Sequence, residues 1–554
     1  MNFKAPLIKW KGQIGSVAIG IATFGALTNW KILNPLFVRW LYWGDPSSSY
    51  LGWQFFRKTP LLQFPLGASP KYGVGFASSI LYSESIPLIA IPLKYVSFLL
   101  PHNFQYFGLW IFSAIILQSW FAWKLISKFI TQLPIALFGV ILFTNAPILI
   151  YRLVHDGSGH LGFVGQFVIL CAINLLLETG NNRCKWFILL AATTLISLFF
   201  VPMVFFIYIL WICKSSLIKS IKPSKRYLAG VLDLMIGLFV IAGTLWSCGG
   251  LMGSDLSDSG FGKYRTTLSS FFDPQVNGSF AFSRLIPNLG NIPGTEEGFA
   301  FLGIPVFILL ITGLLQLYKK SHPLINREYF LLILGTALMA MYSLSNRVAL
   351  LQRELFTYSI PAHLKNISET FRSSGRFVWP FVYVLILFGL ISLSILWDHS
   401  KSIGLMLLLV VFSIQIFDNF DIYSNTQHRF SEVQFDPQLT SPKWDQIAQQ
   451  YDHLVAIPPL NNDPGWFELA MLADKWGLST NTTYLGRLNR MAFESERAKI
   501  QSDLESLQFD QRTMYIITNY PPNPMNDVIL KKYGPTSLGH TQAFTLDGFT
   551  VIAP

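Results

Sequence analysis

The sequence predicts an α-helical polytopic membrane protein that ends in a small α/β domain. Hydrophobic residues make up 52% of the 554-residue chain, charged residues only 13%, and the mean hydropathy is +0.43. Such a composition leaves too little polar surface for a soluble globular protein. Because the long apolar runs stop before the last quarter of the chain, we expect a multi-spanning membrane domain over residues 1–420 and a soluble extracytoplasmic domain over residues 421–554.

The first apolar run follows Lys4, Lys9 and Lys11 and continues to about Phe37. It exceeds the roughly 20 residues that a bilayer requires, so we expect an anchor and not a cleavable signal peptide. Further apolar runs lie at about residues 104–123, 132–151, 161–178, 186–213, 227–246, 300–318, 329–345, 377–397 and 401–417. A shorter run over residues 85–101, which contains two prolines, is expected to be a half-embedded helix.

Basic residues predict the orientation, because short cytoplasmic loops are enriched in Lys and Arg. The N-terminal lysines place the N-terminus in the cytoplasm. The other basic loops fall on the same side only if residues 186–213, with Pro202 near their middle, form a hairpin of two short helices. This gives about eleven membrane segments, an extracytoplasmic C-terminus and large external loops at residues 38–103, 247–299 and 346–376.

The C-terminal domain differs from the rest in charge and in pattern. It contains 10 Lys+Arg and 15 Asp+Glu, whereas the membrane part contains 31 basic and 15 acidic residues. Strand-like runs at residues 453–457, 513–518 and 544–553 alternate with helical patterns at 466–476 and 494–507, which predicts an α/β fold. This domain has neither a Gly-rich phosphate loop nor a nucleophile elbow.

The net charge of +11 does not indicate nucleic-acid binding, because the basic excess lies beside membrane segments, where anionic lipids account for it. A disulfide framework or zinc site is not expected either. The four cysteines lie in or beside apolar segments without metal-ligand spacing: Cys171, Cys184, Cys213 and Cys248. Because the basic excess lies beside membrane segments, membrane lipid is the expected partner of the basic residues.

The loop after the first apolar run carries the leading catalytic candidate, Asp45. An acidic residue at the membrane surface can take a proton from an acceptor hydroxyl, and nearby Arg57 could hold a lipid-linked phosphate. The loop is rich in aromatic residues and proline, which suits sugars and interfacial lipid. Alternatively, Asp45 forms a turn or a helix N-cap in its Gly-Asp-Pro context.

Glu84 precedes the half-embedded helix and is a second acidic candidate. Its charge would interact favourably with the N-terminal end of that helix, which is a purely structural role. In a site with Asp45 it would instead bind a divalent metal or raise the pKa of the first carboxylate. No cofactor is required by the sequence.

Ionisable residues are densest at Arg152, His155, Asp156 and His160, next to a membrane segment. Such groups are costly at membrane depth and by default indicate function. The two histidines are five residues apart with glycines between them, so they would not share one face of a helix, and zinc binding is weakly supported. Phosphate contact by Arg152 and a histidine is the preferred interpretation, and an ordinary interfacial loop is the alternative.

Two further external loops supply charged candidates. Lys263 and Arg265 could neutralise phosphate, and Glu296 or Glu297 could bind acceptor hydroxyls or a metal, unless they belong to a solvated loop. Arg376 precedes a membrane segment on the external side, against the usual charge bias, and a lipid phosphate would explain it.

Several strings resemble a family of large bacterial inner-membrane proteins catalogued as a domain of unknown function: GDPSSSYLGWQFFRKTP, PLGASPKYG, SSILYSESIPLIA, FQYFGLW, LVHDGSGH, GKYRTTLSSFFDP, EEGFAFLG and SGRFVWP. The resemblance runs nearly end to end. The family's architecture is similar to that of GT-C glycosyltransferases, which implies a polyprenyl-phosphate-linked sugar donor and an acidic residue in the first external loop that serves as the base, at Asp45. Where the family's Ser-x-Ser element carries an aspartate, this chain has Glu84.

We therefore expect a GT-C-type glycosyltransferase that transfers a sugar to a glycan or lipid acceptor of the cell envelope at the extracytoplasmic face of the bacterial inner membrane. The arginines would stabilise the departing polyprenyl phosphate. Two alternatives stay open. One is a transporter or flippase of a lipid-linked precursor, which predicts internal repeats and mid-membrane charges. The other is a non-enzymatic membrane protein of envelope assembly.

Overall fold

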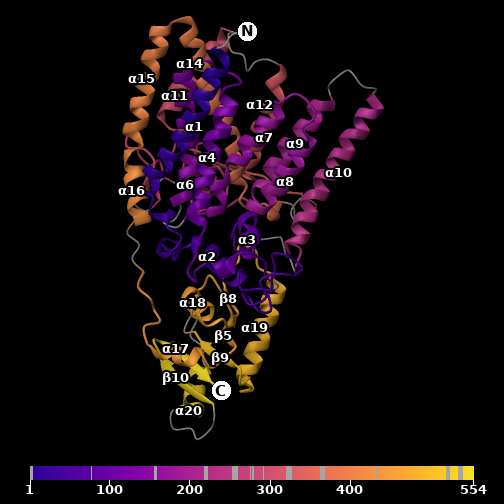
Figure 1. Ribbon diagram of the computed structural model, residues 1–554, viewed down its shortest axis with the longest axis vertical. Helices are drawn as coiled ribbons and strands as arrows, with labels where there is room; N and C mark the ends of the chain where they lie inside the picture. Colours follow the sequence, from indigo (N-terminus) through magenta and orange to yellow (C-terminus); the bar gives the residue numbers. More distant parts are fainter. Residues whose placement is uncertain are drawn as a thin grey trace. The chain divides into compact units, whose positions relative to one another are not determined.

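The computed structural model describes residues 4–76, 78–154, 159–216, 223–252, 260–274, 276–277, 280–290, 292–319, 327–361, 363, 368–431, 435–518, 525–534 and 541–554. The chain divides into two compact units (Figure 1). The helical unit comprises Met1–Trp40, Gln105–Ala242 and Ser257–Val433. The C-terminal unit comprises Leu41–Phe104, Gly243–Leu256 and Gln434–Pro554.

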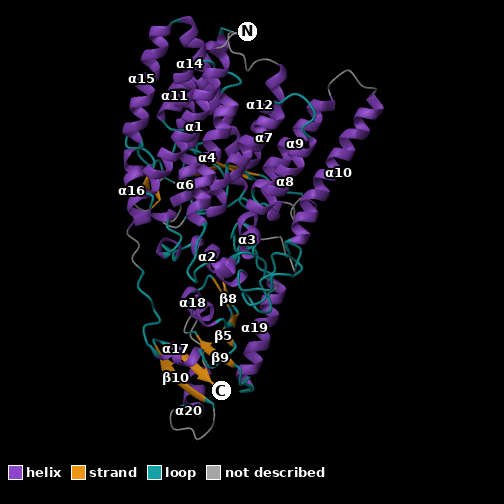
Figure 2. Cartoon of the chain, viewed as in Figure 1, coloured by secondary structure: helices purple, strands orange, loops and turns teal. Residues whose placement is uncertain are grey.

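Helices form most of the helical unit (Figure 2). They are α1 (Lys4–Thr28), α4 (Phe107–Ile126), α5 (Leu133–Thr144), α6 (Pro147–Val154), α7 (Phe167–Leu177), α8 (Arg183–Ile196), α9 (Phe200–Ser216), α10 (Pro223–Ser247), α11 (Ile304–Tyr318), α12 (Arg327–Ser343), α14 (Trp379–His399), α15 (Lys401–Asp418) and α16 (Phe420–Ser431). Short 3-10 helices η5 (Leu161–Gly165), η6 (Thr295–Gly298) and η8 (Ser374–Val378) lie between them.

Within the described residues, five helical stretches are long and apolar enough to cross a membrane: Phe107–Ile126, Leu133–Val154, Tyr227–Ser247, Ser374–His399 and Lys401–Ser431. Four shorter apolar helices lie at Leu161–Leu177, Phe200–Ser215, Ile304–Tyr318 and Tyr329–Ser343. The prediction of a mostly helical chain with several membrane helices is confirmed at this level. The count of about eleven segments stays a prediction.

Proline and glycine account for the local geometry of these helices. The second candidate span is divided between α5 and α6, directly before Pro147, because the residue before a proline disfavours helical backbone. Residues 186–213 are divided between α8 and α9; the break lies at residues 197–199, just before Pro202, which the first turn of α9 accommodates. Helices α1 and α4 approach closely at Gly20, where a Cβ would lie 3.1 Å from the Cα of Ile116.

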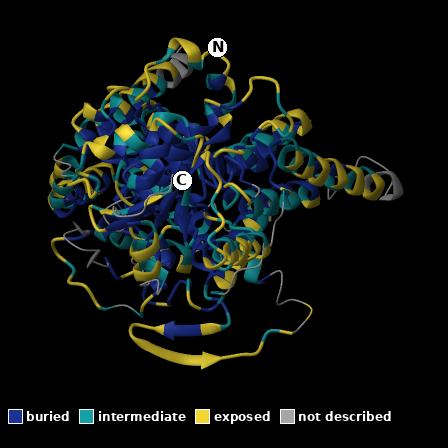
Figure 3. Cartoon of the chain, turned by 90° about the horizontal axis from the view of Figure 1, so that it is seen from below, coloured by how far each residue is buried: buried dark blue, intermediate teal, exposed yellow. Residues whose placement is uncertain are grey.

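Two short hairpins interrupt the helices of this unit. Strand β1 (Val276–Asn277) pairs with β2 (Phe280–Ala281), and β3 (Arg347–Leu350) pairs with β4 (Arg353–Thr357), both antiparallel. All five residues of β4 are exposed, as the yellow strand in Figure 3 shows. The described part of the helical unit thus places its larger hairpin between α12 and η8.

The C-terminal unit contains a five-stranded sheet with strand order β10-β11-β9-β5-β7. Strand β5 is parallel to both β9 and β7, whereas β11 is antiparallel to β9 and β10. Its elements are α2 (Asp45–Phe56), α3 (Pro87–Lys94), α17 (Lys443–Ala448), β5 (His453–Ile457), β6 (Leu460–Asn461), α18 (Trp466–Trp476), β7 (Ser479–Thr480), β8 (Thr482–Thr483), α19 (Arg490–Glu505), β9 (Thr513–Ile517), α20 (Met525–Tyr533), β10 (Gln542–Leu546) and β11 (Phe549–Ala553). The predicted α/β fold of the tail is confirmed.

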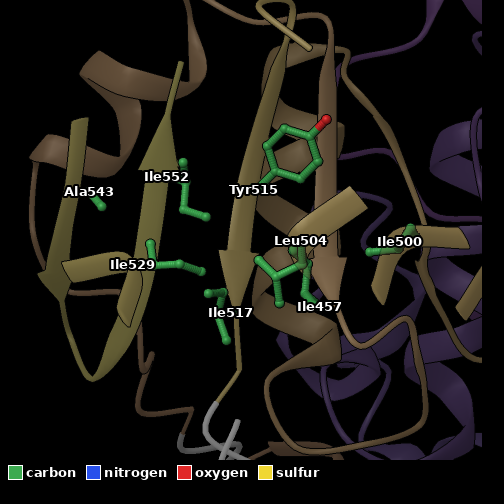
Figure 4. Close-up of a cluster of buried hydrophobic side chains, with 8 residues drawn as sticks. All are labelled: Ile457, Ile500, Leu504, Tyr515, Ile517, Ile529, Ala543 and Ile552. Atoms are coloured by element: carbon green, nitrogen blue, oxygen red, sulfur yellow. The ribbon is translucent and has the colours of Figure 1, made fainter. Parts of the chain in front are cut away.

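One hydrophobic core of this unit lies where α19 and α20 cover the sheet. Figure 4 shows its buried side chains, which come from four strands and both helices: Ile457, Ile500, Leu504, Tyr515, Ile517, Ile529, Ala543 and Ile552. Apolar residues at alternate positions of the strands face these helices, as expected for a sheet covered on this side.

The loop over residues 41–104 folds together with this α/β domain as part of the same unit. Tyr72 forms a parallel bridge with Thr480 on the edge strand β7, and the Thr480 carbonyl oxygen accepts hydrogen bonds from the N–H groups of Gly73 and Val74. The loop therefore covers a sheet edge that would otherwise present unpaired backbone groups. This packing brings Asp45 to the α/β domain.

Candidate functional site

Asp45 is the first residue of α2, preceded by Gly44 with a φ of 59°. Its half-buried carboxylate accepts a hydrogen bond at Oδ1 from the hydroxyl of Tyr484, a residue of the α/β domain. A carboxylate in the first turn also interacts favourably with the helix dipole. Asp45 is thus held in one orientation while part of it stays accessible to solvent, which is what a general base requires.

Tyr484 is itself fixed by the loop that carries Asp45. Its backbone N–H donates to the hydroxyl of fully buried Tyr72 at 3.1 Å, and its carbonyl oxygen accepts from Ser48 Oγ at 2.5 Å. The indole of Trp466 packs edge-on against its ring, with 5.7 Å between the centroids. Two segments distant in the sequence therefore position one carboxylate.

Glu84 lies on the segment that packs against α2. Ser49 Oγ donates to the Glu84 carbonyl oxygen at 3.1 Å, and Ser85 Oγ donates to the Ser49 carbonyl oxygen at 2.7 Å. Gly52 permits this contact, since a Cβ there would lie 2.1 Å from Ser83 Oγ. Glu84 has a φ of 52°, in the left-handed region that is rare for residues other than glycine, and its side chain is half-buried. Asp45 and Glu84 thus belong to one block of the C-terminal unit.

Arg57 has a structural position. Its two terminal nitrogens donate to four carbonyl oxygens, those of Ser97, Leu100, Pro101 and His102, at 2.7–3.0 Å. Burial lowers the pKa of Arg57, and Asp474 opposes that shift. Because four of the five N–H donors are used on one turn, we assign Arg57 to holding that turn against the end of α2.

In the helical unit, four predicted candidates meet in a buried ion-pair cluster. Arg152 at the end of α6 donates from Nη1 to Glu297 Oε2 and from Nη2 to the Glu297 carbonyl oxygen, both at 2.8 Å. Arg376 in η8 donates from Nε to the same Oε2 at 2.9 Å. His160 Nε2 lies 3.9 Å from Glu297 Oε1. We call these four residues the arginine cluster.

Burial and aromatic rings surround this cluster. Arg152 is 0% exposed and Arg376 5%. The guanidinium of Arg152 lies 5.2 Å from the ring centroid of Trp379, and that of Arg376 lies 4.2 Å from that of Phe163. Burial alone would raise the pKa of Glu297, but Arg376, Arg152 and His160 together hold it well below its usual range. The carboxylate is therefore ionised at neutral pH.

Two guanidinium N–H groups of the cluster point to anion binding. Arg152 Nε and Arg376 Nη1 are buried and have no hydrogen-bond acceptor among the described residues. An unsatisfied buried donor of a charged group is costly, so an acceptor such as a phosphate oxygen would stabilise it. His155 and Asp156, also predicted for this site, lie outside the described residues.

Close backbone crossings bring the cluster together. A Cβ on Gly298 would lie 2.3 Å from the Arg265 carbonyl oxygen, and a Cβ on Gly375 would lie 2.5 Å from the Cα of Gly298. Thr266 Oγ1 donates to the Gly375 carbonyl oxygen at 3.0 Å. Only glycine fits where these three segments cross. The crossing therefore sets Glu297 beside Arg376.

The remaining predicted residues of these loops have other surroundings. Arg265 donates from Nη2 to Glu354 Oε1 at 2.8 Å, and Glu296 Oε2 accepts from the Gly294 N–H at 2.6 Å. Lys263 is exposed, with its ammonium 5.2 Å from the centroid of the Tyr264 ring. Sequence reasoning missed Glu354 and Tyr484, because neither stands in a motif; Tyr484 ends the polar run Thr480–Tyr484, which could have drawn attention to it.

Metal binding has no built site in the part of the chain that the structure describes. No group of three or more His, Cys, Asp or Glu side chains there could hold a metal ion. The acidic candidates Asp45, Glu84, Glu296 and Glu297 instead have hydrogen-bond or ion-pair partners or lie apart from other metal-ligand side chains.

Comparison with protein families covers nearly the whole chain. Residues 17–420 match the domain of unknown function DUF6311, and residues 443–554 match the DUF6311 C-terminal domain. The protein belongs to the DUF6311 family. No curated protein matches the chain. The expected membership of an uncharacterised family is confirmed, and within DUF6311 the two matched domains contain the arginine cluster and the α/β sheet, respectively.

Proposed function

We propose that this DUF6311 protein is a membrane glycosyltransferase that moves a sugar from a polyprenyl-phosphate-linked donor to a cell-envelope glycan or lipid. The observation that supports it most is the half-buried Asp45 carboxylate, oriented by Tyr484 at the start of a helix. A group of this kind suits proton abstraction from a hydroxyl, because it is fixed and partly accessible.

In the proposed reaction, Asp45 takes the proton of the acceptor hydroxyl while the oxygen of that hydroxyl forms a bond to the anomeric carbon. The bond between that carbon and the donor phosphate oxygen breaks, and polyprenyl phosphate leaves with the bonding electron pair. The reaction inverts the anomeric configuration because attack and departure occur on opposite faces. Tyr484 is a positioning residue, since it holds the carboxylate and touches no reacting atom.

A phosphate-linked donor also needs a cationic binding group, and the arginine cluster of the helical unit has the chemistry for this role. Arg152 and Arg376 are two guanidinium groups on one carboxylate, with one N–H each that lacks an acceptor among the described residues. Guanidinium groups bind phosphate oxygens through charge-assisted hydrogen bonds. We assign donor-phosphate binding to this cluster on its chemistry alone.

We further propose the bacterial inner membrane as the location, with a cytoplasmic N-terminus and an extracytoplasmic C-terminal domain. The resemblance to GT-C enzymes implies that the donor is used on that face, and the basic loops support the orientation. Labelling of single cysteines introduced at Met491 and at Ser127 by a membrane-impermeant reagent in intact spheroplasts tests it: only the cysteine at position 491 should react.

The decisive experiment uses Asp45→Asn in the full chain, reconstituted with polyprenyl-phosphate-linked mannose and glucose as probes. Release of free polyprenyl phosphate is measured by mass spectrometry, and envelope glycans are analysed in cells. We expect at least about a hundredfold loss of turnover, the usual contribution of a general base. Asp527→Asn is the matched control, because Asp527 is an exposed aspartate in the first turn of α20.

Tyr484→Phe tests the positioning role. It should lower kcat by about tenfold with little change in KM, whereas Tyr95→Phe, at an exposed tyrosine of the same unit, should leave both unchanged.

Full turnover by a stably inserted Asp45→Asn variant would contradict the assignment of Asp45 as the base. If the wild type shows no turnover but moves a labelled lipid between leaflets, the result would favour a flippase over an enzyme.

A further inference from the structure

Four lysine side chains gather at the C-terminal end of α7, away from every residue assigned above. Lys124 Nζ lies 2.7 Å from Glu178 Oε1, and Lys185 Nζ lies 3.0 Å from Glu178 Oε2. One carboxylate therefore bridges the last turn of α4 to the first turn of α8. Both lysines are partly accessible to solvent, because the Lys124 side chain is 43% exposed and the Lys185 side chain is 60% exposed.

The other two lysines reach the same turn of α7 through its backbone. Lys128 Nζ donates to the Asn174 carbonyl oxygen at 3.2 Å, and Lys214 Nζ donates to the Leu176 carbonyl oxygen at 2.8 Å. These oxygens belong to the last turn of the helix, where cations interact favourably with the dipole. We call Lys124, Lys128, Lys185 and Lys214 the lysine cluster.

The cluster carries more positive charge than its neighbours compensate. In the part of the chain that the structure describes, the four ammonium groups of the cluster lie around a single carboxylate, that of Glu178. Partial burial lowers the pKa of Lys128; Lys124, Lys214 and Lys185 lower it further, and Glu178 opposes them. The site therefore has a net positive potential that favours an anion.

The position of the cluster specifies the kind of anion. Apolar helices α4, α7 and α9 all end at these residues, and the first of them is long enough to cross a membrane. The ends of such helices lie at the depth of the lipid headgroups. Basic pockets between membrane helices at that depth suit phosphate headgroups.

We propose that the lysine cluster is a binding site for the phosphate headgroup of an anionic membrane lipid. Lys128 and Lys214 contact phosphate oxygens, while Lys124 and Lys185 add charge and hold Glu178. The acyl chains of the lipid lie along the apolar surfaces of the helices that end at the cluster. This site is independent of the proposed glycosyl transfer and of the arginine cluster.

The test uses the full chain in nanodiscs of phosphatidylcholine with increasing phosphatidylglycerol, and native mass spectrometry counts the lipids that remain bound. The variant is Lys128→Gln with Lys214→Gln, because removing Lys124 or Lys185 would take one of its two salt-bridge partners from Glu178. We expect the affinity for phosphatidylglycerol to fall about tenfold. Lys319→Gln with Lys401→Gln is the matched control, since both lysines are exposed at ends of other apolar helices.

Three further arms keep the outcome clear. Lys128→Arg with Lys214→Arg keeps the charge and should bind as the wild type does. Raising salt from about 0.1 M to about 1 M shortens the Debye length from about 10 Å to about 3 Å and should weaken retention by the wild type. Inorganic phosphate should not compete. Equal retention of both lipids, an unaffected glutamine variant, or displacement by inorganic phosphate would each overturn the proposal.

Discussion

At the scale of single residues, Glu297 is a carboxylate held among buried charged groups of the helical unit. It accepts hydrogen bonds from two buried guanidinium groups, and its own side chain is only 12% exposed. Moving such ions from water into the protein interior costs free energy. The ion pairs offset this desolvation cost but add little net stability. Removing one partner lowers the stability of the fold, because the remaining charged groups then stay buried without a counter-ion.

Glu297→Gln should therefore lower the free energy of unfolding by about 3–5 kcal/mol, because Arg152 and Arg376 lose their common counter-ion. Denaturant unfolding in detergent, followed by tryptophan fluorescence, measures the change. Glu296→Gln is the neighbouring control and should cost less than about 1.5 kcal/mol, since Glu296 is half-buried and accepts a backbone N–H. Equal effects of the two substitutions would contradict the cluster.

The pH dependence of this contribution follows from the lowered pKa of Glu297. A carboxyl group with a folded-state pKa below its unfolded value of about 4.3 stabilises the fold above that value and loses the contribution as pH falls through the folded pKa. The stability difference between wild type and Glu297→Gln should stay constant from about pH 8 to about pH 5. It should narrow only on further acidification; narrowing between pH 7 and pH 6 would instead indicate a histidine.

At the scale of elements, glycines decide how closely the segments of the arginine cluster approach. The 3-10 helices η6 and η8 carry Glu297 and Arg376, respectively, and cross next to the segment of Arg265. The helices themselves follow from the apolar runs, whereas the crossing depends on the absence of Cβ atoms at two positions.

Gly298→Ala should destabilise the helical unit by about 1–3 kcal/mol, because its Cβ would collide with backbone atoms that cannot move independently. It should also weaken the contact between Glu297 and Arg376. Gly243→Ala in α10 is the control: its Cβ would meet nothing within 4 Å, and alanine favours helix by about 0.5–1 kcal/mol. Thermal unfolding of both variants in the same detergent measures the difference, and a tolerated Gly298→Ala would refute the crowding argument.

At the scale of the whole chain, residues 41–104 and 434–554 fold as one unit although about 330 residues separate them. Tyr72 is central to this packing: it is 1% exposed, bridges to β7 and accepts the Tyr484 N–H. Asp45 receives its partner only because these two segments fold together.

Tyr72→Ala should therefore loosen both segments at once. Deletion of a buried aromatic side chain costs about 3–5 kcal/mol, and the amide of Tyr484 loses its acceptor. Hydrogen–deuterium exchange should accelerate in peptides over residues 66–82 and 478–486, with no change in peptides from α4 or α14. Tyr95→Ala, at an exposed tyrosine, should leave all of them unchanged; acceleration in only one segment would argue against a shared unit.

Composition and periodicity by themselves determined the class of this protein. Apolar runs of sufficient length form helices whatever their partners, because lipid leaves no other way to satisfy backbone hydrogen bonds. Alternation in the tail indicated strands for a similar local reason. Arg152, His160, Glu297 and Arg376 could each be selected from the sequence, since charges beside membrane segments stand out against their surroundings.

Only the tertiary structure decided which of these residues meet. Arg152 and Glu297 are 145 positions apart, and no local pattern encodes a backbone crossing that two glycines permit. The same limit applies to Tyr484, whose hydroxyl reaches Asp45 from 439 positions away, and to Arg57, which local reading assigned to phosphate although its donors bind one turn. Local sequence specifies which groups can ionise and which segments are apolar; long-range packing specifies the partner each group finds.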